Sequence, residues 1–248
     1  MDSVKVLILI KMEFVVNKLR LGLFLILLFG WIGQSWADYS EGFVAYHSGD
    51  YKTALNEFKP LAQQGHSDAQ YNLGYMYLYG QSVLQSDKEA VKWYRLAAQQ
   101  GHSDAQKDLA FMYRYGDRVL QSDKEAVKWY RLAAEQGYAK AQYNLGYMYE
   151  TGGGVLQNYK EAVKWYRLAA EQGDADAQNN LAIMYDNGKG VLQNYILGHM
   201  WFNLAAYNGR SNATLLLTVI ADNMDSTQIY EAQKLAQQCL ASNYKNCG

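Results

Sequence analysis

Residues 141–173 read AQYNLGYMYETGGGVLQNYKEAVKWYRLAAEQG, and this stretch carries the pattern that decides the fold. In its first half, residues of one helix face recur at every fourth position: Ala141, Leu145 and Tyr149. In its second half, residues follow the i, i+3, i+4, i+7 spacing of one buried helix face: Ala162, Trp165, Tyr166 and Ala169. Glycines separate the two halves and one glycine closes the stretch. It therefore predicts a hairpin of two helices.

The same hairpin returns along the chain with a step of 36 residues. The closing glycine recurs at Gly65, Gly101, Gly137, Gly173 and Gly209, and the tryptophan recurs at Trp93, Trp129, Trp165 and Trp201. Such a period is typical of helical repeat arrays, because one hairpin cannot bury its own apolar face and must cover it with the next hairpin. We therefore predict an all-α fold, an α-solenoid of stacked antiparallel helix hairpins.

The array is predicted to cover residues 38–240 in about six helix pairs, with degenerate pairs at both ends. The first pair has Glu57 where later units have tryptophan, and Pro60 where they have leucine. Terminal repeats are expected to differ, because one of their faces meets water. Residues 241–248 form a C-terminal tail.

Residues 1–37 have the features of a secretory signal peptide. Lys18 and Arg20 precede an uncharged apolar run from Leu21 to Gly33, and the small residues Ser35 and Ala37 suit a cleavage site. We expect cleavage near Ala37 and a secreted or periplasmic protein. An uncleaved anchor is the alternative, because the apolar stretch from Val4 to Ile10 could lengthen the segment. Translation could begin at Met1 or at Met12.

Both cysteines lie near the C-terminus, at Cys239 and Cys247. In an exported protein they could form a disulfide that ties the tail to the last helix. Two free buried cysteines are the alternative. Neither cysteine follows the signal directly, so we expect no lipid anchor.

Local patterns predict the ends of the helices and the packing of the turns. Ser67 with Gln70, and Ser103 with Gln106, have the spacing of capping boxes that open the first helix of a unit. The turn between the helices carries Val-Leu-Gln four times, beginning at Val83, Val119, Val155 and Val191. We expect the valine and leucine to pack beneath the hairpin. An exposed, adhesive loop edge is the alternative.

The Ala-Gln-x-Asn-Leu-Gly-x-Met-Tyr start, the Gly-x-Gly-Val turn and the Glu-Ala-Val-Lys-Trp-Tyr-Arg-Leu-Ala-Ala-Glu-Gln-Gly close resemble the Sel-one-like repeat, which is related to the tetratricopeptide repeat. The resemblance spans Tyr39 to about Cys239. It implies a right-handed superhelix that serves as a protein-interaction scaffold, often in exported bacterial proteins. Gln81-Ser82 and Asp117-Arg118 depart from the glycine pattern of the turn, which leaves the shape of these two turns open.

The sequence offers little for catalysis. Its four histidines are His47, His66, His102 and His199, without the spacing of a zinc site, and no nucleophile-elbow, phosphate-loop or dinucleotide fingerprint is present. We expect no enzyme, no metal and no cofactor. Cysteine-rich relatives have been linked with cell-wall or β-lactam compounds, so a weak hydrolase is the alternative, and a purely structural envelope spacer is another.

The expected partner is a protein or peptide that lies along the first helices of the units. Positions that vary there at i, i+4 and i+7 form one stripe on each helix, and stacking would align the stripes into a concave groove. The predicted partner-binding residues are Tyr71, Tyr75, Lys107, Phe111, Arg114, Tyr143, Tyr147, Glu150, Asn179 and Asp186. Packing between neighbouring units is the alternative role for the aromatic ones. The net charge of −1 favours neither nucleic acid nor an anionic membrane, and we expect a monomer.

Overall fold

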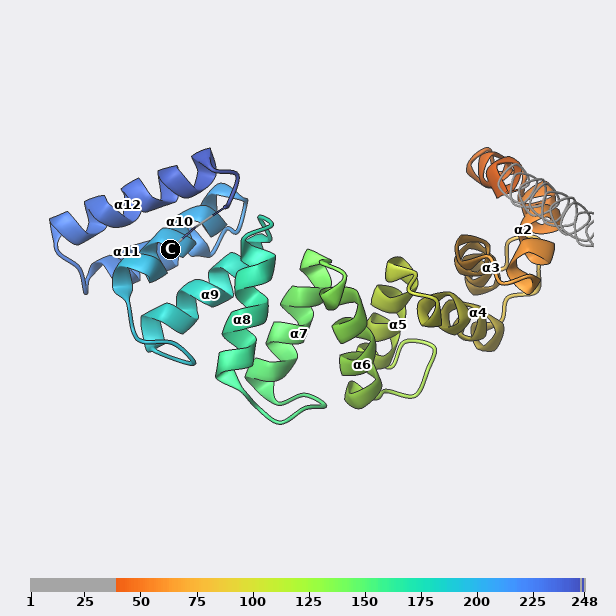
Figure 1. Ribbon diagram of the computed structural model, residues 1–248, viewed down its shortest axis with the longest axis horizontal. Coiled ribbons are helices and arrows are strands. Elements are labelled where there is room, and N and C mark those ends of the chain that lie inside the picture. The colour runs from red at the N-terminus through yellow and green to blue at the C-terminus, as the bar shows by residue number, and fades with distance from the viewer. Residues whose placement is uncertain (1–38, 246, 248) are drawn as a thin grey trace, which may run out of the picture. The chain divides into compact units, whose positions relative to one another are not determined.

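A computed structural model describes residues 39–245 and 247 (Figure 1). Every regular element in these residues is a helix, which confirms the predicted all-α class. The predicted signal peptide lies outside the described residues. The chain divides into two compact units, Met1–Ser86 and Asp87–Gly248, which are described separately below.

The first unit contains a helical segment at residues 39–47, followed by α2 (Tyr51–Gln63) and α3 (Ser67–Tyr79). Phe58 is completely buried, and the Tyr39 ring lies 5.6 Å from its ring. Gly42 is required at this contact, because a Cβ atom there would lie 2.8 Å from the Phe58 ring. Pro60 is accommodated within α2.

The second unit is a run of nine helices within the described residues. They are α4 (Asp87–Gln99), α5 (Ser103–Tyr115), α6 (Asp123–Glu135), α7 (Ala139–Thr151), α8 (Tyr159–Ala170), α9 (Ala175–Asn187), α10 (Tyr195–Tyr207), α11 (Ala213–Ala221) and α12 (Ser226–Ala241). Consecutive helices from α4 to α11 pack against one another, and α12 packs on α10. The predicted stack of hairpins is therefore confirmed.

Small and large side chains alternate in the core of this unit. In α6 the buried residues are Ala126, Val127, Trp129, Tyr130, Ala133 and Ala134, and in α5 they include Ala105, Leu109 and Ala110. The alanines allow neighbouring helices to approach, while the large aromatic rings fill the space between them. Glycines in left-handed conformation then end α5, α7 and α9: Gly116, Gly152 and Gly188.

The predicted capping boxes at Ser67 and Ser103 are wrong. The N-cap residues of α3 and α5 are His66 and His102, whose Nδ1 atoms accept hydrogen bonds from the backbone N–H of the residue three positions on. Gln106 does not reach back to the start of its own helix. Its Nε2 atom donates instead to the Ala98 carbonyl, 3.0 Å away on α4, and the side chain is buried.

The buried glutamines form a polar ladder between successive hairpins. Gln142 and Gln178 repeat the arrangement, donating to the carbonyls of Ala134 and Ala170. The carbonyl oxygen of each ladder glutamine accepts a hydrogen bond from the amide side chain thirty residues later, in three pairs: Gln136 to Gln106, Gln172 to Gln142, and Asn208 to Gln178. Each pair satisfies polar atoms that burial would otherwise leave without partners.

The turn leucines do not pack beneath the hairpins, so this expectation is wrong for them. The leucine of each Val-Leu-Gln turn is about nine-tenths exposed: Leu84, Leu120, Leu156 and Leu192. The neighbouring valines are only half-buried. Ser82 and Arg118, which replace glycine, adopt the left-handed conformation with φ of 55° and 63°, close to 72° at Gly154 and 74° at Gly190. All four turns therefore keep a left-handed residue at this position.

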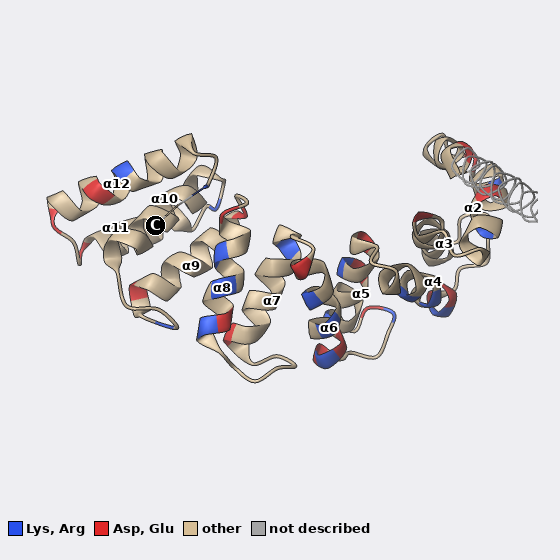
Figure 2. Cartoon of the chain, viewed as in Figure 1, with Lys and Arg blue, Asp and Glu red and all other residues tan. Residues whose placement is uncertain are grey.

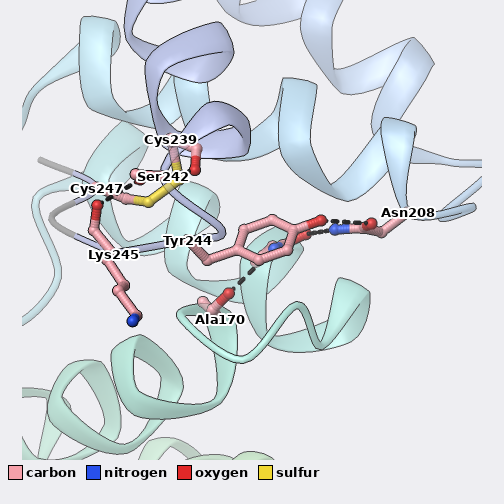
Figure 3. Close-up of a disulfide and its surroundings, with 8 residues drawn as sticks. Ala170, Asn208, Cys239, Ser242, Tyr244, Lys245 and Cys247 are labelled. Carbon is pink, nitrogen blue, oxygen red and sulfur yellow. Dashed lines mark hydrogen bonds between the residues drawn. A yellow bond between two sulfur atoms is a disulfide. The ribbon is translucent and has the colours of Figure 1, made fainter.

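The C-terminal tail folds back on the last hairpins (Figure 3). Cys239 and Cys247 are joined in a disulfide across a Cα–Cα distance of 5.0 Å, in agreement with the pairing that the sequence suggested. Between them, the Tyr244 hydroxyl donates to Asn208 Oδ1 at 2.8 Å. The Tyr244 ring also covers Gly173, where an added Cβ would lie 3.3 Å from it. Because Asn208 also donates to Gln178, Tyr244 adds the last hydrogen bond at the C-terminal end of the glutamine ladder.

Candidate functional site

An exposed group of aromatic rings lies on α5 and α7, which are the first helices of two consecutive hairpins. Phe111 is 51% exposed, Tyr115 is 62% exposed and Tyr147 is 40% exposed. The rings of Phe111 and Tyr115 lie 4.6 Å apart on successive turns of α5. We call these three residues the aromatic patch.

Arg114 connects the two helices of the aromatic patch. Its guanidinium lies 5.9 Å from the Tyr147 ring centroid and forms an ion pair with Asp123 at 2.7 Å. Partial burial acts to lower the pKa of Arg114, but the hydrogen bond and charge of Asp123 outweigh it and raise the pKa. The cation at the edge of the patch is therefore held in place and partly neutralised.

Lys107 also has carboxylates close by. Its Nζ lies 2.8 Å from Asp104 and 3.8 Å from Asp108. Partial burial lowers the pKa of the Lys107 amine, yet the two carboxylates more than compensate and the pKa is raised. Lys107 stays charged, with two acidic neighbours on its own helix.

Tyr143 and Glu150 take part in contacts within the protein. The half-buried Tyr143 ring lies 5.9 Å from the Tyr166 ring, with Lys140 Nζ 4.6 Å from its centroid. Glu150 accepts a hydrogen bond from the Tyr166 hydroxyl at 2.6 Å. Burial, and then this bond, raise the pKa of Tyr166 far above its usual value, so Tyr166 remains a neutral donor. For these two positions, packing between the helices is the better-supported role.

The predicted stripe is interrupted on α9. Asn179 is only 3% exposed, so the structure removes it from any surface that a partner could contact. The variation of residue type at this position among the repeats did not reveal its burial. Asp186 is partly exposed, and burial raises the pKa of its carboxyl group.

Tyr71 and Tyr75 lie on α3 in the first unit, where both are half-buried. The Tyr75 ring lies 4.5 Å from Tyr79 and 6.2 Å from Tyr46. Tyr79 is 53% exposed. Tyr75 with Tyr79 thus repeats the arrangement of Phe111 with Tyr115. Tyr79 and Tyr115 were not among the predicted site residues, although each lies four residues after one of them, on the same helix face.

A metal site within residues 39–245 would require several ligand side chains close together. No group of three or more His, Cys, Asp or Glu residues in this range could hold a metal ion. His199 is buried, with Asn203 Nδ2 2.9 Å from its Nδ1, and burial lowers its pKa. Among the same residues, no helix has both the length and the hydropathy that crossing a bilayer requires.

The fold and the exposed patch together define a helical-repeat protein, an α-solenoid of stacked hairpins. The Sel1 repeat matches the chain four times, at residues 67–102, 103–138, 139–174 and 175–209, which together are more than half of its length. The chain belongs to the Sel1 repeat family. This confirms the resemblance seen in the sequence.

Solved structures of the same fold support this assignment. The protein c5321, a protective antigen present in uropathogenic Escherichia coli strains and displaying an SLR fold, is 31% identical with a TM-score of 0.71. The alignment covers 85% of this chain but 47% of c5321, so the chain spans about half the length of that protein. A Sel1 repeat protein from Oxalobacter formigenes is 34% identical with a TM-score of 0.70, over 79% of this chain and 84% of its own. No curated protein matches the chain.

Proposed function

We propose that this protein is an exported scaffold that binds a segment of another protein through its first helices. The observation that carries the proposal is the aromatic patch: Phe111 and Tyr115 expose adjacent rings on α5, and Tyr147 exposes its ring on α7 near Arg114. Rigid aromatic anchors next to an arginine are the residues that contribute most to protein interfaces. Helical repeat arrays present such residues on successive first helices.

The charged residues set the orientation of the partner more than its affinity. Arg114 and Lys107 already have carboxylate neighbours, so a partner would compete with Asp123, Asp104 and Asp108 for them. Charge pairs that stay near the surface contribute little free energy. The aromatic rings are therefore the residues whose removal tests the proposal most directly.

Site-specific photocrosslinking tests the proposal. A photoreactive phenylalanine analogue at position 111 should form covalent adducts with a defined partner in intact cells. The matched control places the same analogue at Lys128, an exposed position on α6. Adducts from position 111 alone support the scaffold, and the double variant Phe111→Ala/Tyr115→Ala should lose the partner while keeping its melting temperature. Equal adducts from both positions, or none from either, would favour a purely structural spacer.

Export is the second part of the proposal. The charged start and apolar run of residues 18–33 support it, as does the pairing of Cys239 with Cys247, since disulfides persist in oxidising compartments. Cell fractionation followed by N-terminal sequencing of the mature protein should find Asp38 as its first residue. A mature chain that retains Met1 or Met12 in the cytoplasmic fraction contradicts export.

A further inference from the structure

A pocket of about 550 Å³ lies between α4 and the turn that joins α5 to α6. One carboxylate, Asp87, lines it together with four cationic side chains. The cations are Lys88, Lys92, Arg95 and Arg118. Its volume falls in the range of natural ligand sites. The pocket shares no residue with the aromatic patch, so it is a separate feature of the second unit.

The turn that forms one wall is unusual because of Arg118. In the next two repeats this position is Gly154 and Gly190, and these turns lie directly against the starts of α6 and α8, the second helices of the previous hairpins. A Cβ atom on Gly154 would lie 2.4 Å from the carbonyl group of Asp123, and one on Gly190 would lie 2.3 Å from the carbonyl oxygen of Tyr159. Only glycine permits such an approach.

Arg118 carries a Cβ atom, which the close approach seen at Gly154 and Gly190 would not accommodate. Its guanidinium pairs with Asp87, the counterpart of Asp123, at 2.8 Å, and its Nε lies 3.7 Å from Asp117. Arg118 keeps the left-handed conformation of the glycines, with φ of 63°. A single replacement within the repeat thus rules out that approach and adds a cation to the opening.

The chemistry of the walls indicates the class of ligand. Lys88 has no ion pair within the described residues, and Lys92 pairs with Glu89, which is not part of the lining. The Arg95 guanidinium donates to the Tyr113 hydroxyl at 2.5 Å, which holds it at the pocket wall. The lining therefore carries four cations and one carboxylate, and two further carboxylates, Glu89 and Asp117, lie beside Lys92 and Arg118.

The lining also includes apolar residues. They are Val91 on α4 and, in the turn, Val119 and the almost fully exposed Leu120. A ligand that places carboxylates against the lysines and an aliphatic group against Leu120 would match both kinds of residue. Along other helices of this unit, Lys and Arg residues are interspersed with Asp and Glu residues (Figure 2), which favours a small acidic ligand over a nucleic acid.

We propose that this pocket binds a short acidic peptide segment that carries one aliphatic side chain between carboxylates. The site goes beyond the scaffold function proposed above and does not depend on the aromatic patch. Its recognition rests on charge-assisted hydrogen bonds from Lys88, Lys92 and Arg118 and on apolar contact with Leu120. Binding should weaken as the salt concentration rises.

Fluorescence anisotropy with a labelled peptide, Glu-Asp-Leu-Asp-Glu, tests the proposal on the full chain without its first 37 residues. We expect saturable binding that weakens at least about tenfold when sodium chloride rises from about 50 to about 500 mM. A peptide with serine in place of leucine should bind several-fold more weakly, and a Lys-Lys-Leu-Lys-Lys peptide should not bind. Absence of saturation at about 1 mM protein, or equal binding of all three peptides, overturns the proposal.

Matched variants then locate the site. Lys88→Ala/Lys92→Ala should weaken binding at least tenfold, whereas Lys124→Ala/Lys128→Ala, at the same positions of the next repeat, should leave it unchanged. The two pairs have the same helix neighbours, since Lys92 pairs with Glu89 and Lys128 with Glu125. Equal losses in both double variants would show general charge attraction and overturn the site.

The decisive variant is Arg118→Gly. It removes a left-handed non-glycine residue and lets the turn approach α4, so the melting temperature should stay the same or rise while peptide binding is lost. Unchanged binding overturns the proposal. Phe111→Ala/Tyr115→Ala should bind the peptide normally, which separates this site from the scaffold function. Vesicles containing phosphatidylserine should not compete with the peptide, and competition by them would assign the pocket to a membrane surface instead.

Discussion

The Tyr244 hydroxyl donates a hydrogen bond to Asn208 Oδ1 at 2.8 Å, across 36 residues of sequence. Asn208 in turn donates to Gln178, and Gln178 donates to the Ala170 carbonyl. The tail thus supplies the last member of a polar ladder that runs through the buried interfaces of the second unit. The end of a repeat array needs such a capping contact, because no further repeat follows there to supply hydrogen-bond partners.

Tyr244→Phe should lower the free energy of unfolding by about 1 kcal/mol, since it removes one hydrogen bond and keeps the ring on Gly173. The measurement is chemical denaturation followed by circular dichroism. The control is Tyr230→Phe on α12, where the ring is 68% exposed and the change should have no measurable effect. Equal effects of the two variants would contradict a role for the tail hydroxyl.

Cys239→Ser/Cys247→Ser should release the tail. A disulfide that closes so short a loop contributes about 2–3 kcal/mol through the entropy of the unfolded chain. We expect faster hydrogen exchange in residues 241–245 and unchanged exchange in α5 to α8. Intact mass spectrometry of the purified protein should show two hydrogen atoms fewer before reduction than after it. A protein whose mass does not change on reduction has no such bridge.

Gln142→Leu should destabilise the protein by about 1–2 kcal/mol, because it removes the hydrogen bond from Gln142 to the Ala134 carbonyl and the one from Gln172 to Gln142. Gln99→Leu, on the exposed side of α4, is the matched control and should change stability by less than about 0.5 kcal/mol. Thermal unfolding of both variants tests this. A small effect at Gln142 would mean that water replaces the lost bonds.

Gly154→Ala should cost about 3 kcal/mol or more, because the added Cβ would lie 2.4 Å from the Asp123 backbone and the turn would have to move. Gly137→Ala is the control for backbone strain alone. Its φ is also positive, at 94°, but nothing lies within 4 Å of the added atom, so the cost should be about 1 kcal/mol. Similar losses at both sites would remove the steric argument that underlies the role of Arg118.

Stability should fall as the pH drops below about 6.5, and His199 should account for part of the loss. Burial lowers the pKa of His199, so the folded protein keeps it neutral while the unfolded chain takes up a proton. Between the two pKa values the free energy of unfolding should decrease by up to about 1.4 kcal/mol for each pH unit. Denaturation of wild type and His199→Gln between about pH 7.5 and pH 5 measures this. The pH dependence should be shallower in the variant, and parallel curves would exclude His199.

The sequence predicts the repeat step, the helix hairpins and the turn positions, because each depends on one local pattern repeated along the chain. It also suggested the pairing of Cys239 with Cys247, which are only eight residues apart. The contacts between repeats could not be predicted. Gln106 has the spacing of a capping residue, yet a carbonyl on the preceding helix offers it a buried partner. The position of Asn179 varies among the repeats as a surface position would, but the side chain is buried in the folded array.

The sequence by itself determined the architecture of this protein, since apolar residues with a helical period must be buried and each hairpin can bury them only against the next one. The tertiary structure alone decided which side chains remain free for a partner. In the folded protein Phe111 and Tyr115 are exposed, whereas Glu150 accepts a hydrogen bond from Tyr166. Arg118, which stands where later repeats have glycine, lines a charged pocket. Exposure depends on how closely neighbouring repeats approach, and no single repeat encodes that distance.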